Sequence, residues 1–280
     1  MKKRTITNQI INSFEKHLLE NEKAGATIQK YMRDIRCFMD YAKDQSLDKT
    51  LLLNYKAVLE QNYAVRSANS MLAALNAFFR FQGWHDLCVK QFKVQKEAYC
   101  SEERELTKAE YTALVRTAEL KKNERLSLVV QTICGTGIRV SELQSITVEA
   151  VRRGEAIVSC KGKTRKIFIV KALQKKLLRY AIEQGIATGT LFITKSGKPL
   201  DRSNIWRQMK DLCEQAGVSP QKVFPHNLRH LFARTFYGIE KDIAKLADIL
   251  GHSNINTTRI YIITTGAEHQ RRMENMRLII

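Results

Sequence analysis

The chain lacks both a long hydrophobic run and a pair of closely spaced cysteines. No apolar segment approaches the roughly 20 residues that a membrane-spanning helix needs, and the basic start Met-Lys-Lys-Arg-Thr is not followed by the apolar stretch of a secretion signal. We therefore expect neither membrane insertion nor export. The six cysteines lie far apart and form no CxxC pair, so we expect free thiols in a reducing cytoplasm.

The sequence also lacks a metal-ligand pattern, internal repeats and low-complexity segments. A zinc site needs four converging ligands, and neither the cysteines nor the six histidines form such a group. His226 and His230 stand four residues apart, as on one helix face, but the residues between them lack the glutamate of the HExxH metalloprotease pattern. We expect no metal and no cofactor.

Positive charge, by contrast, is abundant. The 280 residues contain 47 Lys and Arg against 28 Asp and Glu, a formal net charge of +19 at pH 7. Residues 1–100 contain 16 basic against 10 acidic residues, and the remainder 31 against 18. The positive electrostatic field of such a chain attracts nucleic acid or anionic lipid, and the charge alone does not distinguish between these two partners. Because both halves are basic, both could face the same polyanion.

Length and periodicity predict two globular domains, because 44% hydrophobic content over 280 residues is enough for two cores. Apolar residues recur at helical spacing from residue 8 to about 82, which predicts a small helical domain over 1–90. Residues 91–105 are polar and mixed in charge, as in a linker, and residues 106–280 form the second domain. The basic residues on the polar faces of the first domain could contact phosphates, although hydration is the simpler interpretation for each: Lys30, Arg33, Arg36, Lys43, Arg66 and Arg80.

The second domain should be mainly helical with a small antiparallel sheet. Thr107 and Glu110 have the spacing of a capping box, which predicts a helix start. Strand character is present at 146–151, 156–159 and 167–170, with a lysine-rich hairpin tip at 161–166. Further helical patterns cover 126–133, the stretch after the Gly135-Thr-Gly137 turn, 173–182, 202–216, 227–236 and 243–250.

One constellation in this domain points to phosphate chemistry. Gly251 and His252 are followed by Tyr261 nine residues after the histidine, and a cluster from His226 to Arg229 lies shortly before them. A phosphodiester is attacked in line, so cationic donors must hold its non-bridging oxygens while one hydroxyl approaches from the side opposite the leaving oxygen. The pattern therefore favours a phosphate clamp beside a nucleophilic tyrosine, and a DNA strand-transfer enzyme.

Four motifs, in order and in register, resemble those of the tyrosine recombinase family, which includes the phage integrases and Xer-type recombinases. The resemblance covers roughly residues 104–270, and the helical domain before it resembles the family's SAM-like core-binding domain. The segments that carry it are Gly135-Thr-Gly137-Ile-Arg139-Val-Ser-Glu142-Leu143, Lys161-Gly162, His226-Asn-Leu-Arg229-His230 and Leu250-Gly251-His252 through Tyr261. Departures are small: Cys160 stands where glycine is common, and two isoleucines follow the tyrosine.

The resemblance implies a role for each motif residue. Arg139 and Arg229 would clamp the phosphate, His226 would donate to it or exchange a proton with the tyrosine hydroxyl, and His252 would be a further donor. Tyr261 would attack phosphorus to give a 3′-phosphotyrosyl bond and a free 5′ hydroxyl. From residues alone, Arg139 could instead be a helix-surface arginine paired with Glu142. Likewise, Arg229 could pack beneath the preceding helix and Tyr261 could belong to the core.

Two lysines compete for the remaining role. The leaving 5′ oxygen is a much stronger base than a phenolate, so a proton donor on the leaving side should accelerate cleavage. The hairpin lysine of the family aligns best with Lys161, ahead of the glycine, and Lys163 is the alternative. His230 is interpreted as a buried helix residue rather than a catalyst.

The expected activity is site-specific DNA recombination, either integration and excision of a mobile element or Xer-type resolution. The implied partners are double-stranded DNA, three further copies of the chain in a homotetramer on paired sites, and accessory DNA-bending proteins. The amphipathic tail after Tyr261 would pack on its own domain or dock into a neighbouring copy. Two rivals stay open: a type IB topoisomerase, with nearly the same chemistry, and a non-catalytic DNA-binding protein.

Overall fold

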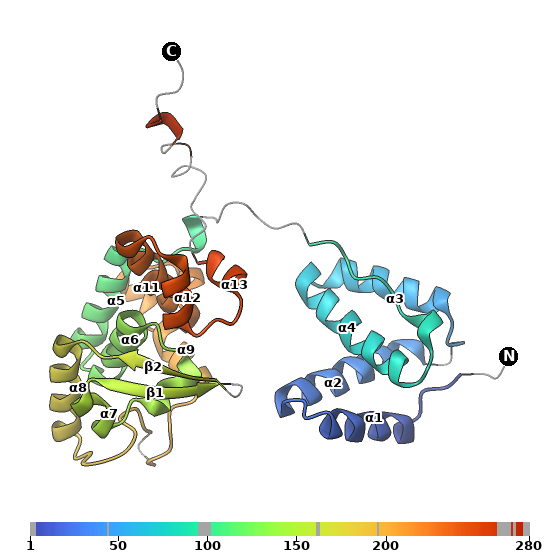
Figure 1. Ribbon diagram of the computed structural model, residues 1–280, viewed down its shortest axis with the longest axis horizontal. Helices are drawn as coiled ribbons and strands as arrows, with labels where there is room; N and C mark the ends of the chain where they lie inside the picture. The colour runs from blue at the N-terminus through green and yellow to red at the C-terminus, as the bar shows by residue number, and fades with distance from the viewer. Residues whose placement is uncertain are drawn as a thin grey trace. The chain divides into compact units, whose positions relative to one another are not determined.

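The computed structural model describes residues 4–43, 45–94, 102–160, 163–194, 196–261, 270 and 273–276 (Figure 1). The chain divides into two compact units, residues 1–96 and 97–280. No helix within the described ranges combines the length and the apolar character needed to cross a membrane. Four cysteines within the described ranges are free thiols: Cys37, Cys88, Cys134 and Cys213.

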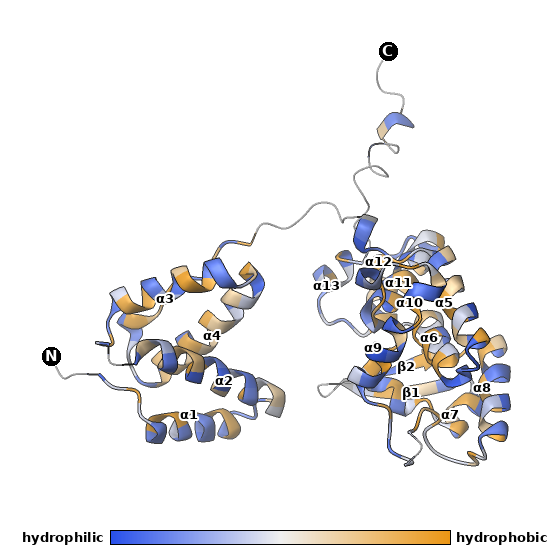
Figure 2. Cartoon of the chain, turned by 180° about the vertical axis from the view of Figure 1, so that it is seen from behind, coloured by the Kyte–Doolittle hydropathy of each residue, from blue (hydrophilic) through white to orange (hydrophobic). Residues whose placement is uncertain are grey.

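The first unit is a helical bundle, as its periodicity predicts. Its elements are α1 (Asn8–Glu20), α2 (Gly25–Ala42), α3 (Lys49–Asn62), α4 (Val65–Phe81) and the 3₁₀ helix η1 (His85–Leu87). Hydrophobic and hydrophilic residues alternate along these helices (Figure 2). The apolar faces meet in a core in which Phe38, Phe78 and Phe79 are fully buried. Burial of such faces is what makes amphipathic helices of this length stable in water.

An extended segment after η1 is bound along α4 by two asparagine side chains. The Asn76 amide donates to the Val89 carbonyl at 2.8 Å and accepts from the Val89 amide at 2.9 Å. Asn69, seven residues earlier on the helix, makes the same pair of bonds with Phe92 at 2.9 and 2.7 Å. Residues 91–94, the start of the expected linker, therefore lie against the first unit, and residues 95–101 lie outside the described residues.

The second unit is built around α6 (Glu124–Thr136), which packs mainly against three other helices and also contacts α9 (Arg202–Lys210). The three main partners are α5 (Lys108–Leu120), α8 (Lys171–Glu183) and α11 (Pro225–Glu240). The capping box at the start of α5 is present: Thr107 accepts from the Glu110 amide at 3.1 Å, and the Glu110 carboxylate accepts from the Thr107 amide at 2.8 Å. Shorter helices complete this unit: η2 (Glu102–Arg104), η3 (Val140–Ser145), α7 (Val148–Arg153), α9 (Arg202–Lys210), α10 (Cys213–Ala216), η4 (Pro220–Lys222), α12 (Ile243–Leu250) and α13 (Ile255–Arg259).

The small antiparallel sheet consists of β1 (Glu155–Cys160) and β2 (Lys163–Phe168), joined by residues 161 and 162. In its register, Val158 lies opposite Arg165. One face is turned to the core, because Ala156, Val158 and Ile167 are buried, whereas Ile157 and Phe168 on the other face are exposed. A mainly α fold with a small antiparallel sheet is thus confirmed.

The strand predicted at residues 146–151 is wrong, because residues 148–151 belong to helix α7. The Thr147 hydroxyl accepts from the Ala150 amide at 3.1 Å, and Gly154 ends the helix in the left-handed conformation at φ 78°. Val148 and Val151 are both buried at the helical i,i+3 spacing. Capping at both ends therefore outweighs the β-branched composition that suggested a strand.

Three further boundaries differ from the prediction. The lysine-rich segment is not a long tip, because β2 begins at Lys163 and residues 163–166 lie in the ladder. The helix expected over 202–216 is two helices, α9 and α10. The segment after the glycine turn is the 3₁₀ helix η3 rather than an α-helix. Each difference falls where a short element ends, which is where periodicity carries the least information.

Candidate active site

Tyr261 lies just beyond α13, and its ring is enclosed by aromatic and apolar side chains. The residue is 4% exposed and packs with Ala233, Leu246 and Leu250. Its hydroxyl lies 3.4 Å from Nε2 of His226. The tyrosine therefore combines a core-like ring with a hydroxyl that meets a titratable group.

Three histidine rings surround this tyrosine. The centroids of the His230, His252 and His226 rings lie 4.2, 5.4 and 5.5 Å from that of Tyr261. Burial lowers the pKa of His230 to about 4, and the neighbouring His226 and Arg229 contribute in the same direction. His230 is thus a neutral ring packed against Tyr261, and it is half-buried rather than buried.

Arg229 is 2% exposed, and among the described residues it is held by backbone carbonyls and not by an acidic side chain. Its Nη1 donates to the carbonyl of Gly137, and its Nη2 donates to that of Leu250 at 2.7 Å. Burial lowers its pKa to about 10, with a further contribution from Arg139. Carbonyls fix a guanidinium without neutralising it, so the positive charge stays available to an anion.

His252 follows Gly251, which ends α12 in the left-handed conformation at φ 66°. Its Nε2 lies 3.0 Å from Nη2 of Arg229, and its Nδ1 lies 2.9 Å from Oγ1 of Thr258. Because a guanidinium can only donate, Nε2 accepts in this arrangement and Nδ1–H donates to the threonine. Burial and the neighbouring arginines lower the pKa of His252 to about 4. The neutral His252 ring therefore accepts a hydrogen bond from Arg229 and helps to hold its guanidinium in place.

His226 is the first residue after Pro225, near the start of α11. Its side chain is exposed, unlike those of the two other histidines at the site. Desolvation by the surrounding protein, followed by the charges of Arg229 and Arg139, lowers the pKa of His226. A neutral His226 can accept a proton from the nearby tyrosine hydroxyl.

Arg139 immediately precedes η3 and bonds to Glu142. Its Nη1 donates to one carboxylate oxygen at 3.0 Å, and its backbone amide donates to the other at 2.9 Å. The pairing suggested by the sequence is therefore present, but Glu142 is only 5% exposed, so this is no ordinary surface ion pair. The charge of Arg139 lowers the pKa of Arg229, His226 and His252, which shows that all four side chains share one region.

Arg165 is a member of this cluster that sequence reasoning missed. It lies in the segment 161–166 that the sequence predicts as a lysine-rich hairpin tip, yet its side chain is 11% exposed and binds Glu142 through Nη1 and Nη2, both at 2.8 Å. A signal was present, because Arg165, Ile167 and Ile169 alternate along one strand and both isoleucines are apolar. That pattern places Arg165 on the core side.

The structure therefore brings together five of the six predicted site residues: Arg139, His226, Arg229, His252 and Tyr261. The sixth, Lys161, lies outside the described residues, as does the side chain of Lys163. Among the described residues, no group of three or more His, Cys, Asp or Glu side chains could hold a metal ion. Three arginines against one glutamate leave a net positive charge beside the tyrosine hydroxyl, which suits an anionic phosphodiester.

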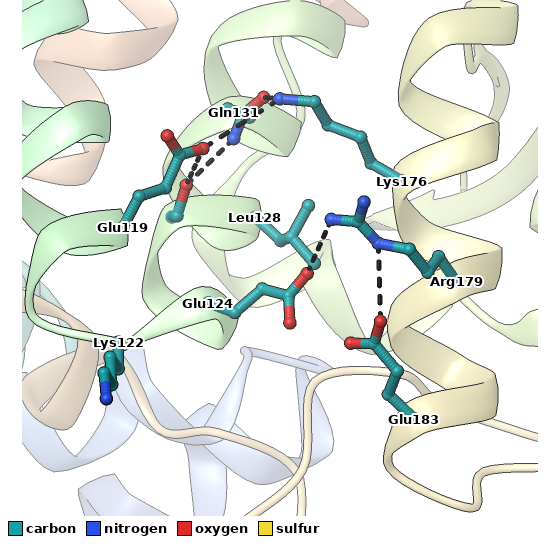
Figure 3. A pocket seen from close by; sticks show the side chains of 9 residues that line it. Glu119, Lys122, Glu124, Leu128, Gln131, Lys176, Arg179 and Glu183 are labelled. Carbon is teal, nitrogen blue, oxygen red and sulfur yellow. Dashed lines mark hydrogen bonds and ion pairs between the residues drawn. The ribbon is translucent and has the colours of Figure 1, made fainter.

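A separate surface pocket of about 370 Å³ lies on another part of this unit (Figure 3). Its charged side chains pair with one another, as Arg179 does with Glu124 at 3.2 Å and with Glu183 at 3.5 Å. None of the predicted site residues lines it. Its lining residues are Glu119, Lys122, Glu124, Ser127, Leu128, Gln131, Lys176, Arg179 and Glu183.

Comparison with known proteins gives matches along nearly the whole chain. The model of the phage integrase family matches residues 104–267, and that of the phage integrase N-terminal SAM-like domain matches residues 11–85. The tyrosine recombinase XerA of Thermococcus kodakarensis is 30% identical over 282 residues, covering 97% of this chain and 96% of the relative.

Solved structures share the fold at lower sequence identity. A lambda integrase dimer bound to a COC′ core site matches with a TM-score of 0.75 and 20% identity, covering 94% of this chain and 97% of that one. A lambda integrase tetramer bound to a Holliday junction matches with a TM-score of 0.73 and 19% identity, covering 90% of this chain and 76% of that one.

Proposed function

The chain belongs to the phage integrase family, and on that basis we propose that it performs site-specific DNA recombination through a covalent 3′-phosphotyrosyl intermediate at Tyr261. The observation that carries the proposal is the placement of the Tyr261 hydroxyl 3.4 Å from His226, in a cluster where Arg139, Arg165 and Arg229 outnumber the single carboxylate of Glu142. The relatives are named as recombinases, so a topoisomerase or a binding-only role is not favoured.

Cleavage begins with the scissile phosphate bound by Arg139 and Arg229. Their guanidinium groups donate to its non-bridging oxygens, where negative charge grows as the tyrosine oxygen attacks. Neutral His226 takes the phenolic proton. The new bond joins Tyr261 Oη to phosphorus, and the bond to the 5′ oxygen breaks.

The 5′ oxygen leaves with a proton, and Lys161 is the proposed donor, with Lys163 as the alternative. A phosphodiester is exchanged for a phosphotyrosyl diester, so little bond energy is lost. A 5′ hydroxyl from another strand can then attack in reverse and release the tyrosine. Because each phosphodiester bond that breaks is replaced by another, the reaction requires neither nucleotide hydrolysis nor a redox partner.

The proposed assembly is a homotetramer on two paired duplex sites. A lambda integrase with this fold was solved as a tetramer on a Holliday junction, and both units of this chain carry excess positive charge for phosphate neutralisation. We assign core-site binding to residues 1–90, the linker to 91–105 and catalysis to 106–280. Accessory DNA-bending proteins and a cytoplasmic location stay predictions from the sequence.

The test uses a pool of random-sequence duplexes carrying a nick, so that the cleaved fragment diffuses away and the covalent adduct accumulates. Wild type should form an adduct that survives denaturation, whereas Tyr261→Phe should form none while binding the same DNA. Tyr237→Phe is the matched control, because it removes a tyrosine hydroxyl from the same unit and should leave the adduct yield unchanged. Equal adduct yields from wild type and Tyr261→Phe would reject the assignment.

A further inference from the structure

We propose that Arg165 is a positioning residue for Arg139, acting through Glu142; this rests on the proposed function. Each oxygen of the Glu142 carboxylate accepts two bonds, one from Arg165 and one from Arg139. Oε1 accepts from Arg165 Nη1 at 2.8 Å and from Arg139 Nη1 at 3.0 Å. Oε2 accepts from Arg165 Nη2 at 2.8 Å and from the Arg139 amide at 2.9 Å.

Arg165 is itself anchored on two sides, which lets it act as a fixed point. Its backbone is paired with Val158 in the sheet, and its Nε donates to the Ile249 carbonyl at 3.1 Å. Its Cδ also lies where a Cβ on Gly251 would come within 2.6 Å, so the glycine permits this close approach. The side chain thus joins the hairpin to the end of α12.

Within the part of the chain that the structure describes, the Arg139 side chain is bound by Glu142 alone. Arg139 precedes a short 3₁₀ helix, and its side chain is 31% exposed. A long guanidinium side chain in that setting samples many rotamers unless a fixed acceptor selects one. Glu142 is that acceptor, and bidentate pairing with Arg165 selects the orientation of its carboxylate.

The same arrangement connects both phosphate-binding arginines to one turn of the chain. The carbonyl of Ile249 accepts from Arg165, and the carbonyl of Leu250, one residue later, accepts from Arg229. Arg139 is therefore connected, through Glu142 and Arg165, to the end of α12 that also binds Arg229. The two proposed phosphate-binding arginines, 90 positions apart in sequence, are thus held in place by the same turn of the chain.

Charge supports a positioning role over direct substrate binding. Glu142 is buried, and its hydrogen bonds and ion pairs with Arg165 and Arg139 outweigh burial and lower its pKa to about 2. With the carboxylate ionised, one of the two arginine charges is balanced and the other remains for the phosphate. Because the Arg165 side chain is 11% exposed and that of Arg139 is 31% exposed, Arg139 is the group open to DNA.

The experiment compares Arg165→Met and Arg165→Lys with Lys166→Met in the full-length protein. Lys166 is the neighbouring β2 residue, but its side chain is 59% exposed and pairs with Glu155, so this variant removes one charge without touching Glu142. Single-turnover cleavage of a nicked duplex at saturating protein should fall by roughly 100-fold or more in both Arg165 variants. Lys166→Met should stay within about threefold of wild type in rate, and all three variants should keep similar DNA affinity.

A second substrate separates the two sides of the scissile phosphate. A bridging sulfur in place of the 5′ oxygen gives a weakly basic leaving group that needs no proton donor. Arg165 variants should remain slow on this DNA, because the defect lies in phosphate binding. If the sulfur substrate fully restored the cleavage rate of the Arg165 variants, the proposal would be overturned and Arg165 would act on the leaving-group side. If the Arg165 variants cleaved the ordinary nicked duplex as fast as Lys166→Met does, Arg165 would have no role in cleavage.

A double-mutant cycle tests the route through Glu142. If Arg165 acts through that carboxylate, Arg165→Met should slow Glu142→Gln little further, whereas additive losses would contradict the route. Arg165→Lys keeps the charge, so the proposal remains testable if the methionine variant fails to fold. Failure of wild type to form any adduct would instead refute the proposed function, a different result from equal rates in wild type and the Arg165 variants.

Discussion

At the scale of single residues, Gly137 shows how closely the site depends on local backbone geometry. It ends α6 in the left-handed conformation at φ 65°, and its carbonyl accepts from Arg229. A Cβ at this position would lie 2.5 Å from Cδ1 of Phe232 and 3.2 Å from Cδ2 of Leu250. Both the dihedral and the space therefore call for glycine.

We expect Gly137→Ala to lower the free energy of unfolding by roughly 1–3 kcal/mol and to slow cleavage, because Arg229 loses a fixed acceptor. Urea unfolding and adduct formation measure the two effects. Gly238→Ala is the control: Gly238 lies inside α11, and a Cβ there meets nothing within 4 Å. It should be neutral or stabilising by up to about 1 kcal/mol, and equal destabilisation by both changes would refute the argument.

Residue identity at the site is largely predictable from the sequence, whereas residue contacts are not. The spacing of His226, Arg229, His252 and Tyr261 by itself indicates a phosphate site, and the structure places these side chains together. Arg165 cannot be assigned in the same way, because its partner carbonyl belongs to a residue 84 positions away. The sequence shows only that Arg165 alternates with apolar residues.

At the scale of elements, the segment bound along α4 is stabilised by side chains that replace a strand partner. Each asparagine side chain has an NH₂ group that donates and a carbonyl oxygen that accepts, so Asn69 and Asn76 satisfy both backbone groups of Phe92 and Val89. Asn76 is 6% exposed. Loss of its amide would leave two backbone groups beside the helix unpaired.

Asn76→Ala should therefore destabilise the first unit by roughly 2–4 kcal/mol. Trp84 reports this unfolding in a Trp206→Phe background, because the chain has only two tryptophans, one in each unit. The control is Asn62→Ala at the exposed end of α3, where a single bond to the Val58 carbonyl is lost. That change should cost less than about 0.5 kcal/mol, and a similar loss from both variants would contradict the assignment.

Element prediction succeeded where helices are long and failed where elements are short. The main helices of the first unit, α1 to α4, repeat an apolar face over several turns, which a window of sequence detects. Helix α7 has six residues, and its β-branched composition resembles a strand. Its capping by Thr147 and Gly154 decided the outcome, together with burial of one helical face.

At the scale of the whole molecule, the stability of the second unit should depend on pH through its neutral histidines. The pKa values of His230 and His252 are lowered to about 4. Because the folded state disfavours their protonated forms, their contribution is complete above about pH 6.5, the unfolded value, and is lost as pH falls toward 4. Glu142 contributes fully above its unfolded pKa and loses that contribution progressively as the pH falls from there toward about 2.

We therefore expect the free energy of unfolding of the second unit to fall by roughly 1–3 kcal/mol between about pH 7.5 and 5.0. Urea unfolding in a Trp84→Phe background, where Trp206 is the reporter, measures this change. A variant with both His230→Asn and His252→Asn should show a flatter dependence, whereas His85→Gln, at an exposed position of the first unit, should not alter it. An unchanged pH dependence in the double variant would rule out these histidines as its source.

Short-range sequence patterns were enough to establish the helical character of the first unit, the capping box of α5 and the order of the site motifs. These features depend on neighbours within a few positions, so their physical cause is local. Folding of the whole unit was needed to join Arg139, Glu142, Arg165 and the end of α12 into one hydrogen-bonded group beside Tyr261. Those bonds connect segments far apart in the chain, and they exist because burial of separate apolar faces brings the segments together.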